Sequence, residues 1–278
     1  MYKKILVNIP TERSPRPVID GAISLAARCK AELDAVSVGY ESSSMPLVAE
    51  GGAAVAVIFE AEREKALERA NAALAVFEAE AKQAGVVHSS RAISALQGEA
   101  AAILGATARL YDLNVVAQPE FERDTFDNTL AQEILFQSGG PVLFMPYTFK
   151  GAFHAKRVGI CWDGSRVAAR AVRDAMPLLE KAEAITIITI NADNNVPAEA
   201  SAANLVRYLS GLGVPTEIDS LKTEKANIQS SILSLASDES LNLLVMGGYG
   251  HSRLKETVFG GVTREMLESM TVPTLMSH

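Results

Sequence analysis

An internal repeat constrains the fold of this chain more than any other feature of its sequence. Residues 3–38 and 156–190 share one order of features: a basic start, a short apolar run, a polar loop, an Ala-rich helical pattern and a second apolar run. The later parts of the two halves also resemble each other, in the paired segments 112–119 with 240–248 and 139–146 with 270–277. We therefore predict two related domains, 1–147 and 152–278, joined by a short connection.

Each half alternates short β-branched runs with longer helical patterns, which is typical of βαβ units around a parallel sheet. In the second half we predict five strands, at Val158–Trp162, Ile185–Ile190, Thr216–Ser220, Leu243–Met246 and Thr274–Met276. Helices are predicted between them, near 165–181, 196–212, 227–237 and 261–270. The first half follows the same plan, so we predict an α/β fold made of two tandem units.

One enlargement distinguishes the first half. After Val38 comes a loop rich in Ser, Gly and Ala, which contains SSSMPLVAEGGAAVAV and precedes a long helix from about Phe59 to Ala84. One apolar stripe of this helix, with charges opposite, is formed by Leu67, Ala70, Leu74 and Phe77. We interpret the helix as the cover of a sheet face, and the loop is long enough to be a lid or a partner segment.

Composition narrows the classes of protein that remain. With 278 residues, 48% of them hydrophobic, the chain is long enough for one large domain or two ordinary ones. No run reaches the roughly 18 to 20 apolar residues of a membrane span, and the apolar run before Pro10 is too short for a secretory signal, so we predict a cytoplasmic protein. A formal net charge of −7 offers no global positive field to nucleic acid or an anionic membrane. Two cysteines and four histidines, without zinc spacing, predict neither a disulfide framework nor a metal site.

Glycine is concentrated near the end of the chain. Five of the nineteen glycines fall between residues 247 and 261, in the stretch MGGYGHSRLKETVFGGVT. Helix N-termini at the carboxyl ends of parallel strands present N–H groups to phosphates, and glycine permits close approach to the backbone. We therefore interpret the stretch as a phosphate cradle, and the alternative is that the glycines only shape a β-to-α turn. Neither a Walker loop nor a G-x-G-x-x-G motif occurs.

The spacing of these glycines, combined with Asp163 in the segment WDGS, resembles the universal stress protein family. The resemblance covers essentially the whole chain as a tandem pair of domains, although the first half is recognised mainly through the repeat. It implies two nucleotide-binding, adenine nucleotide α hydrolase-like domains, each a five-stranded parallel sheet with helices on both faces. In family members that bind ATP, the motif is G-2x-G-9x-G followed by Ser or Thr. Carried over by position, the resemblance implies that Asp163 lies near the nucleoside and that the phosphates of ATP, with Mg²⁺, are held by Gly247, Gly250, Gly260, Gly261 and Thr263.

Gly261 departs from the family pattern, because a hydroxyl residue is expected directly after Gly260. A hydrogen bond to a charged group contributes about 1.5 to 3 kcal/mol, so its loss would weaken binding roughly ten- to hundredfold unless Thr263 and backbone N–H groups compensate. Two hypotheses therefore stay open. The first is a regulatory protein in which ATP or a related nucleotide shifts the geometry of the second half. The second is a nucleotide-independent stress-response module that acts through protein contacts or another small ligand.

Asp163 also has a purely structural interpretation. The sequence Asp-Gly-Ser favours a turn, and Ser165 is a good helix N-cap, so the segment can be explained without a ligand.

The first half is predicted to lack the nucleotide site. Alignment of Pro141 with Pro273 sets Asn128 opposite Gly260, after a loop, QPEFERDTFD, that has no glycine and carries four acids. NIPTERS replaces WDGS, so no carboxylate occupies the clear counterpart of Asp163, and the loop acids would repel phosphate. The resemblance implies that the domains pair through their last strands, PVLFMP and PTLMSH, as an intramolecular pseudo-dimer. A further homodimer and an unidentified protein partner stay open.

We expect no dedicated catalysis. There is no G-x-S-x-G motif, and we interpret Cys29 and Cys161 as packing residues. Trp162 is interpreted as a core or domain-contact residue, and His251 as a solvated loop residue. Because no general base or arginine finger is evident, ATP hydrolysis is expected to be slow or absent.

Overall fold

The chain consists of two halves with the same order of strands and helices. The computed structural model describes residues 1–41, 52–123, 125–191, 196–249 and 261–278, with only the backbone described at 52–55. The first half comprises β1 (Lys4–Ile9), α1 (Arg16–Cys29), β2 (Glu32–Tyr40), α2 (Gly52–Gln83), β3 (His88–Ala95), α3 (Gln97–Ala108), β4 (Leu113–Ala117), α4 (Phe126–Gln137) and β5 (Val142–Met145). The second half comprises β6 (Arg157–Cys161), α5 (Arg166–Leu179), β7 (Ala184–Ile190), α6 (Ala202–Leu209), β8 (Thr216–Leu221), α7 (Ile228–Asp238), β9 (Leu243–Gly247), α9 (Val262–Ser269) and β10 (Thr274–Ser277). All five strands predicted for the second half are present, each within one residue of its predicted bounds.

The strands form one continuous sheet in the order β3-β2-β1-β4-β5-β10-β9-β6-β7-β8. Strand pairs within each half are parallel. The two halves join through β5 and β10, which pair antiparallel. In each half the chain order reverses beside the first strand, since β1 lies between β2 and β4, and β6 lies between β7 and β9. Ligands of open α/β sheets bind outside the carboxyl ends of strands at such switch points, so the topology defines one candidate edge in each half.

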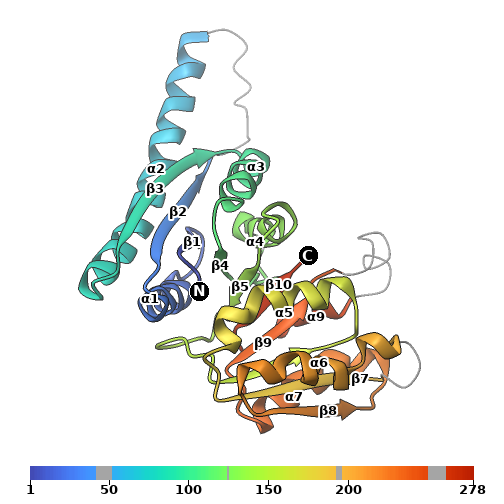
Figure 1. Ribbon diagram of the computed structural model, residues 1–278. Helices are drawn as coiled ribbons and strands as arrows, with labels where there is room; N and C mark the ends of the chain where they lie inside the picture. The colour runs from blue at the N-terminus through green and yellow to red at the C-terminus, as the bar shows by residue number, and fades with distance from the viewer. Residues whose placement is uncertain (42–51, 124, 192–195, 250–260) are drawn as a thin grey trace.

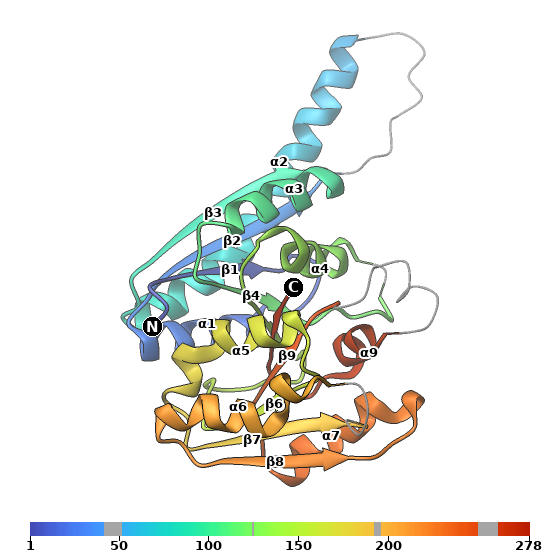
Figure 2. The ribbon, with the colours of Figure 1, turned by 45° about the vertical axis from the view of Figure 1, so that its right-hand side comes forward.

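Helices cover both faces of the sheet, as predicted (Figures 1 and 2). One core contains side chains of α1, α2, α5 and α6, and the other contains side chains of α3, α4, α7 and α9. Successive strand residues point into opposite cores, since Ile5 belongs to the first and Leu6 to the second. The observed architecture is therefore the predicted α/β fold, with a sheet packed between two layers of helices.

Helix α2 begins earlier than the sequence pattern predicts. Residues 52–58, predicted as loop, belong to the helix, and the alanines of this stretch are strong helix formers. Ala70, Leu74 and Phe77 of the predicted stripe are buried, while Leu67 is only half-buried. The helix has 32 residues and so is about 48 Å long, whereas the nine residues of β2 span about 30 Å. Its N-terminal part therefore extends beyond the sheet (Figures 1 and 2).

The helix predicted at 196–212 is divided, because α6 is flanked by 3₁₀ turns at Ala198–Ala200 and Ser210–Leu212. The hydroxyl of Ser201 caps α6 by accepting a hydrogen bond from the backbone N–H of Asn204, and this cap starts a new helix at this point.

None of the helices in the described part of the chain is long and apolar enough to cross a membrane.

Candidate functional site

The carboxyl ends of β6 and β9 bring the predicted residues of the second half to one edge of the sheet. The two strands are neighbours, and both α5 and α9 begin at this edge. Residues at this edge are Asp163, Gly247, Gly261 and Thr263. Gly250 and Gly260, also predicted for the site, lie outside the described residues, as does His251.

Asp163 lies in an exposed turn between β6 and α5. Its Oδ1 accepts a hydrogen bond from the backbone N–H of Ser165 at 2.9 Å, and Gly164 between them has a φ of 72°. The Ser165 hydroxyl in turn accepts from the backbone N–H of Ala168 and caps α5. The structural interpretation of Asp-Gly-Ser as a turn with an N-cap is therefore confirmed. Because only one carboxylate oxygen has a recorded partner among the described residues, the turn leaves Asp163 able to accept a further hydrogen bond.

Trp162, directly before this turn, is nearly buried. Its indole N–H donates to the backbone carbonyl of Ala200 at 2.8 Å, so the ring ties the end of β6 to the start of α6. The interpretation of Trp162 as a core residue is confirmed. It is the chain's one tryptophan, next to Asp163 in sequence.

Gly247 lies where β9 meets the first turn of α5. A Cβ at this position would lie 2.6 Å from Cγ2 of Val167 and 2.7 Å from the backbone nitrogen of Ala168. Contacts this short do not occur between non-bonded atoms, so close packing of β9 against α5 requires glycine here. The space that a side chain would occupy is thus filled by the protein itself, and the glycine does not open a cradle on its own.

The start of α9 offers backbone donors. Gly261 is the N-cap residue and supplies no side-chain cap, so the first N–H groups of the helix lack the partner that Ser165 provides on α5. Thr263, in the first turn, is buried, and its Oγ1 accepts a hydrogen bond from the backbone N–H of Tyr249 at 3.2 Å. No described residue accepts the hydroxyl proton of Thr263. A helix N-terminus whose N–H groups have no side-chain cap among the described residues, beside a buried hydroxyl, fits an anion.

Sequence reasoning missed two aromatic residues next to this helix. Tyr249 has a φ of 51°, an uncommon value for a residue other than glycine, and its ring lies against Phe136 of α4. Phe136 belongs to the first half and is 113 positions from Tyr249 in the chain, so no local pattern could have linked them.

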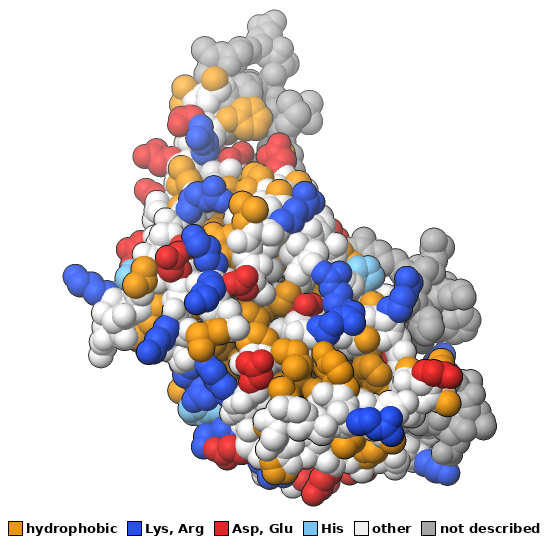
Figure 3. Space-filling view, viewed as in Figure 1, with side chains coloured by type: hydrophobic (Ala, Val, Ile, Leu, Met, Phe, Trp, Pro, Cys, Tyr) orange, Lys and Arg blue, Asp and Glu red, His pale blue; other side chains and the backbone are white. Residues whose placement is uncertain are grey.

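Arginines follow one face of α5. Arg166, Arg170 and Arg173 are spaced by four and three residues, which places them along one side of a helix. Arg166 and Arg173 are exposed, whereas Arg170 donates to the backbone carbonyl of His278 and lies 3.6 Å from an Asp174 carboxylate oxygen. On the face shown in Figure 3, basic side chains gather near the middle of the molecule among scattered acids. A chain of net negative charge therefore still carries a row of three arginines along α5.

The corresponding edge of the first half is occupied by its own side chains. Glu12 Oε2 accepts hydrogen bonds from the backbone N–H groups of Phe126 and Asp127, at 2.7 and 3.3 Å, and so caps the start of α4. Asp127 Oδ2 accepts from the backbone N–H groups of Thr11 and Glu12, at 3.1 and 3.0 Å. A carboxylate of the chain thus lies at the helix N-terminus, where an anionic ligand would otherwise bind.

Arg13 completes this arrangement. Its guanidinium donates to the backbone carbonyls of Gln118 and Ala117, and Tyr40 donates its hydroxyl proton to Asp127 Oδ1 at 3.1 Å. Burial raises the pKa of Asp127, an effect that its hydrogen bonds and Arg13 only partly offset. Burial also raises the pKa of Glu12 and lowers that of the Arg13 guanidinium. Pro10 occupies the position that corresponds to Asp163 in the repeat. The carboxylate at this edge of the sheet comes from Glu12, two residues later.

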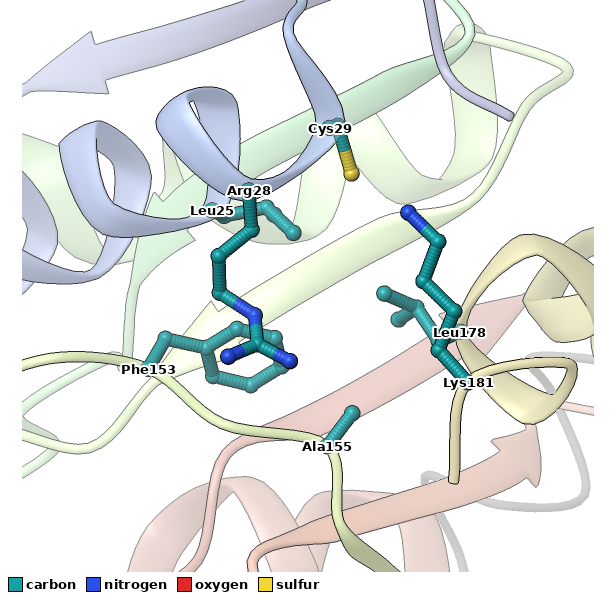
Figure 4. Close-up of a pocket in the computed structure, with 7 residues that line it drawn as sticks. All are labelled: Leu25, Arg28, Cys29, Phe153, Ala155, Leu178 and Lys181. Carbon is teal, nitrogen blue, oxygen red and sulfur yellow. The ribbon is translucent and has the colours of Figure 1, made fainter. Parts of the chain in front are cut away.

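A small cavity lies where the two halves meet (Figure 4). It is lined by residues that include Cys29, Phe153, Leu178 and Lys181, and its volume of about 10 Å³ leaves room for at most one water molecule. Burial raises the pKa of the Cys29 thiol and raises the pKa of Cys161 to about 12, so both thiols are protonated and weakly nucleophilic near neutral pH. The described residues contain no cluster of three His, Cys, Asp or Glu side chains suited to a metal ion.

Comparison with known proteins bears on both the second half and the whole fold. The universal stress protein family model matches residues 154–278. A universal stress protein of Synechocystis sp. is 29% identical over 90 residues, which are 32% of this chain and 30% of that relative. The crystal structure of a universal stress protein from Archaeoglobus fulgidus matches 98% of this chain and 95% of that one, with a TM-score of 0.74 and 14% identity. A putative universal stress protein from Pseudomonas aeruginosa matches 99% and 93%, with a TM-score of 0.56 and 14% identity. At these identities the structural likeness shows the fold alone, and it agrees with the predicted tandem arrangement.

Proposed function

We propose that the chain is a stress-response regulatory protein that binds a nucleotide in its second half, where the universal stress protein family model matches residues 154–278. The ligand is ATP with Mg²⁺ or a related nucleotide, and the site is the edge where β6 and β9 end. The nucleotide acts by binding one geometry of the second half more tightly than another, since a ligand shifts an equilibrium only through such a difference.

The start of α9 is the observation that carries this proposal. Its N-cap, Gly261, has no side-chain hydrogen bond, and the buried Thr263 hydroxyl follows in the first turn. The helix N-terminus favours negative charge, and the exposed Arg166 in the first turn of α5 adds to that preference. Gly247 supports the site indirectly, by letting β9 approach α5 closely.

Asp163 is proposed to bind the nucleoside. Its carboxylate is exposed at the end of β6 and has acceptor capacity beyond its bond to Ser165. A ribose hydroxyl or an exocyclic amine is a donor that a carboxylate binds well. Mg²⁺ would be held chiefly by the phosphates and water, since the described residues supply no ligand cluster.

The test is a calorimetric titration of the nucleotide-stripped full chain with ATP and Mg²⁺. We expect saturable binding that Thr263→Val weakens roughly tenfold or more, because a hydrogen bond to a charged group is lost. The matched control is Thr129→Val, an exposed threonine of α4 in the first half, which should leave affinity unchanged. Absence of heat up to millimolar ATP, in protein shown to be folded, would overturn the proposal.

A second candidate function is a nucleotide-independent module that acts through protein contacts, and three features of the chain favour it. Gly261 replaces the hydroxyl residue of the family motif, Glu12 already occupies the anion position of the first half, and large apolar side chains are exposed on the projecting part of α2. These features suit a module that acts through contact with a protein partner or a second copy of the chain. Sedimentation velocity with and without ATP separates the two functions. A nucleotide-binding regulator predicts that any change in the oligomeric state depends on ATP, whereas a nucleotide-independent module predicts the same oligomeric state with and without it.

Hydrolysis is not part of the proposed function. Neither Cys29 nor Cys161 is an activated nucleophile, because burial raises the pKa of both thiols. We expect turnover of ATP to be slow or absent.

A further inference from the structure

Tyr249 adopts an uncommon backbone conformation directly after β9. Its φ of 51° lies in the left-handed region, which is unfavourable for residues with a Cβ other than Asn and Asp. A residue held there needs surrounding contacts that compensate for the backbone energy, and such residues cluster at functional sites. Two groups of contacts are visible at Tyr249.

The first contact comes from the second half itself. The backbone N–H of Tyr249 donates to Oγ1 of Thr263 at 3.2 Å, so the end of β9 and the first turn of α9 are joined by one hydrogen bond. Thr263 is 5% exposed, which shields this bond from water. This bond therefore fixes the backbone of Tyr249 relative to the start of α9.

The second contact comes from the first half. The ring of Phe136, on α4, lies with its centroid 4.8 Å from that of Tyr249 and 5.0 Å from that of His278. His278 Nδ1 lies 3.1 Å from the carbonyl oxygen of Gly248, so the third ring is tied to the residue before Tyr249. Leu135, next to Phe136, packs against Gly248 so closely that a Cβ there would lie 3.1 Å from its Cδ2.

Helix α4 thus packs against Gly248 and against the ring of Tyr249 from outside the domain to which they belong. We propose that Phe136 is a positioning residue of the second half's site, supplied by the first half: its ring holds Tyr249 in the left-handed conformation that joins β9 to α9. The first half, whose own anion position is filled by Glu12, then acts as a fixed support for the site of its partner half. The consequence for ligand affinity rests on the proposed nucleotide binding, but the positioning itself does not.

Amide hydrogen exchange, followed by NMR on the full chain, tests the positioning directly. In Phe136→Ala we expect the Tyr249 amide to exchange about two- to tenfold faster, the factor that corresponds to loss of one aromatic pair. The amides of β10 should change much less, because local opening at Tyr249 does not require global unfolding. Equal acceleration of Tyr249 and β10, or no acceleration of either, would overturn the proposal. Phe136 is half-buried, so the variant should fold, and Phe136→Leu is a milder substitution at the same position.

Phe126→Ala is the matched control. Phe126 is another phenylalanine of α4, 40% exposed, whose ring packs on Tyr40 within the first half at 5.2 Å. This variant should leave the Tyr249 amide unchanged. If it accelerates that amide as much as Phe136→Ala does, general loosening of α4 explains the effect and Phe136 has no special role.

Two further measurements complete the test. In the Tyr249→Gly background the left-handed conformation carries no penalty, so the amide at position 249 should no longer respond to Phe136→Ala, and a full response would contradict the inference. If the wild type binds ATP, Phe136→Ala should weaken binding by a similar factor while Phe126→Ala does not, and equal affinity would remove Phe136 from the site. If the wild type does not bind ATP, the proposed function fails and amide exchange alone decides the role of Phe136.

Discussion

Leu143 of β5 lies opposite Leu275 of β10, and both side chains are fully buried. This pair stands at the only place in the observed strand order where the two halves meet edge to edge. Strands that would otherwise present open edges are therefore internal, and the outer edges of the sheet are β3 and β8. Because one hydrophobic core contains Leu143 and Leu275 together with helices of both halves, we expect the halves to unfold as one unit.

Leu143→Ala is expected to lower the free energy of unfolding by about 2 to 5 kcal/mol, the usual cost of removing a buried leucine side chain and leaving a cavity. Urea unfolding followed by circular dichroism and by Trp162 fluorescence should give coincident transitions in both proteins. The control is Leu110→Ala, at a side chain that is 81% exposed, which should change stability by less than about 0.5 kcal/mol. Separate transitions for the two probes in the wild type would contradict the idea of a single unit.

Sequence predicts the fold well because the repeat and the alternation of short and long patterns are local signals. The strands Leu243–Gly247 and Thr274–Ser277 were predicted to within one residue for this reason. The start of α2 was missed because AAVAV combines helix-forming alanines with β-branched valines, so neither periodicity is clear.

The candidate site is only partly predictable from sequence. Asp163 and Thr263 lie at the predicted edge because the ends of parallel strands share one side of the sheet. The packing of Gly247 against Ala168 and of Phe136 against Tyr249 depends on how separate elements approach each other in space, and no sequence spacing encodes that.

Glu12→Ala is expected to destabilise the first half. The carboxylate accepts two backbone hydrogen bonds at the start of α4, and loss of a helix cap costs about 0.5 to 2 kcal/mol. Thermal or urea unfolding measures the loss. The control is Glu122→Ala. Glu122 is an exposed glutamate of the loop that precedes α4, and its replacement should leave the free energy of unfolding nearly unchanged. Equal stability of the Glu12 and Glu122 variants would show that the cap contributes nothing.

Stability should also depend on pH through Asp127. Burial raises the pKa of this carboxyl in the folded state, so the folded chain binds a proton more readily than the unfolded chain. Its contribution to stability is therefore fully present below the ordinary carboxyl pKa of about 4 and is lost as pH rises through the raised folded-state pKa. The pKa of Glu12 is raised as well, so both groups act in the same direction.

We expect the wild type to lose stability relative to Asp127→Asn as pH is raised from about 4 towards neutrality. Urea unfolding at a series of pH values gives the difference, and the Glu12→Gln, Asp127→Asn double variant should show the weakest dependence on pH. A difference that stays constant, or that grows in favour of the wild type with rising pH, would contradict the assigned direction.

Gly247→Ala distinguishes a packing role from a ligand role at this glycine. The added methyl group would lie 2.7 Å from the backbone nitrogen of Ala168, which belongs to a helix and cannot move as a flexible side chain would. We therefore expect a loss of about 1 to 3 kcal/mol in the free energy of unfolding without any nucleotide present. Gly211→Ala is the control, because a Cβ there has no neighbour within 4 Å among the described residues, and unfolding should be little changed. If Gly247→Ala instead weakens ATP binding while the stability of the nucleotide-free protein is unchanged, the glycine serves the ligand, and the close approach of β9 to α5 does not explain it.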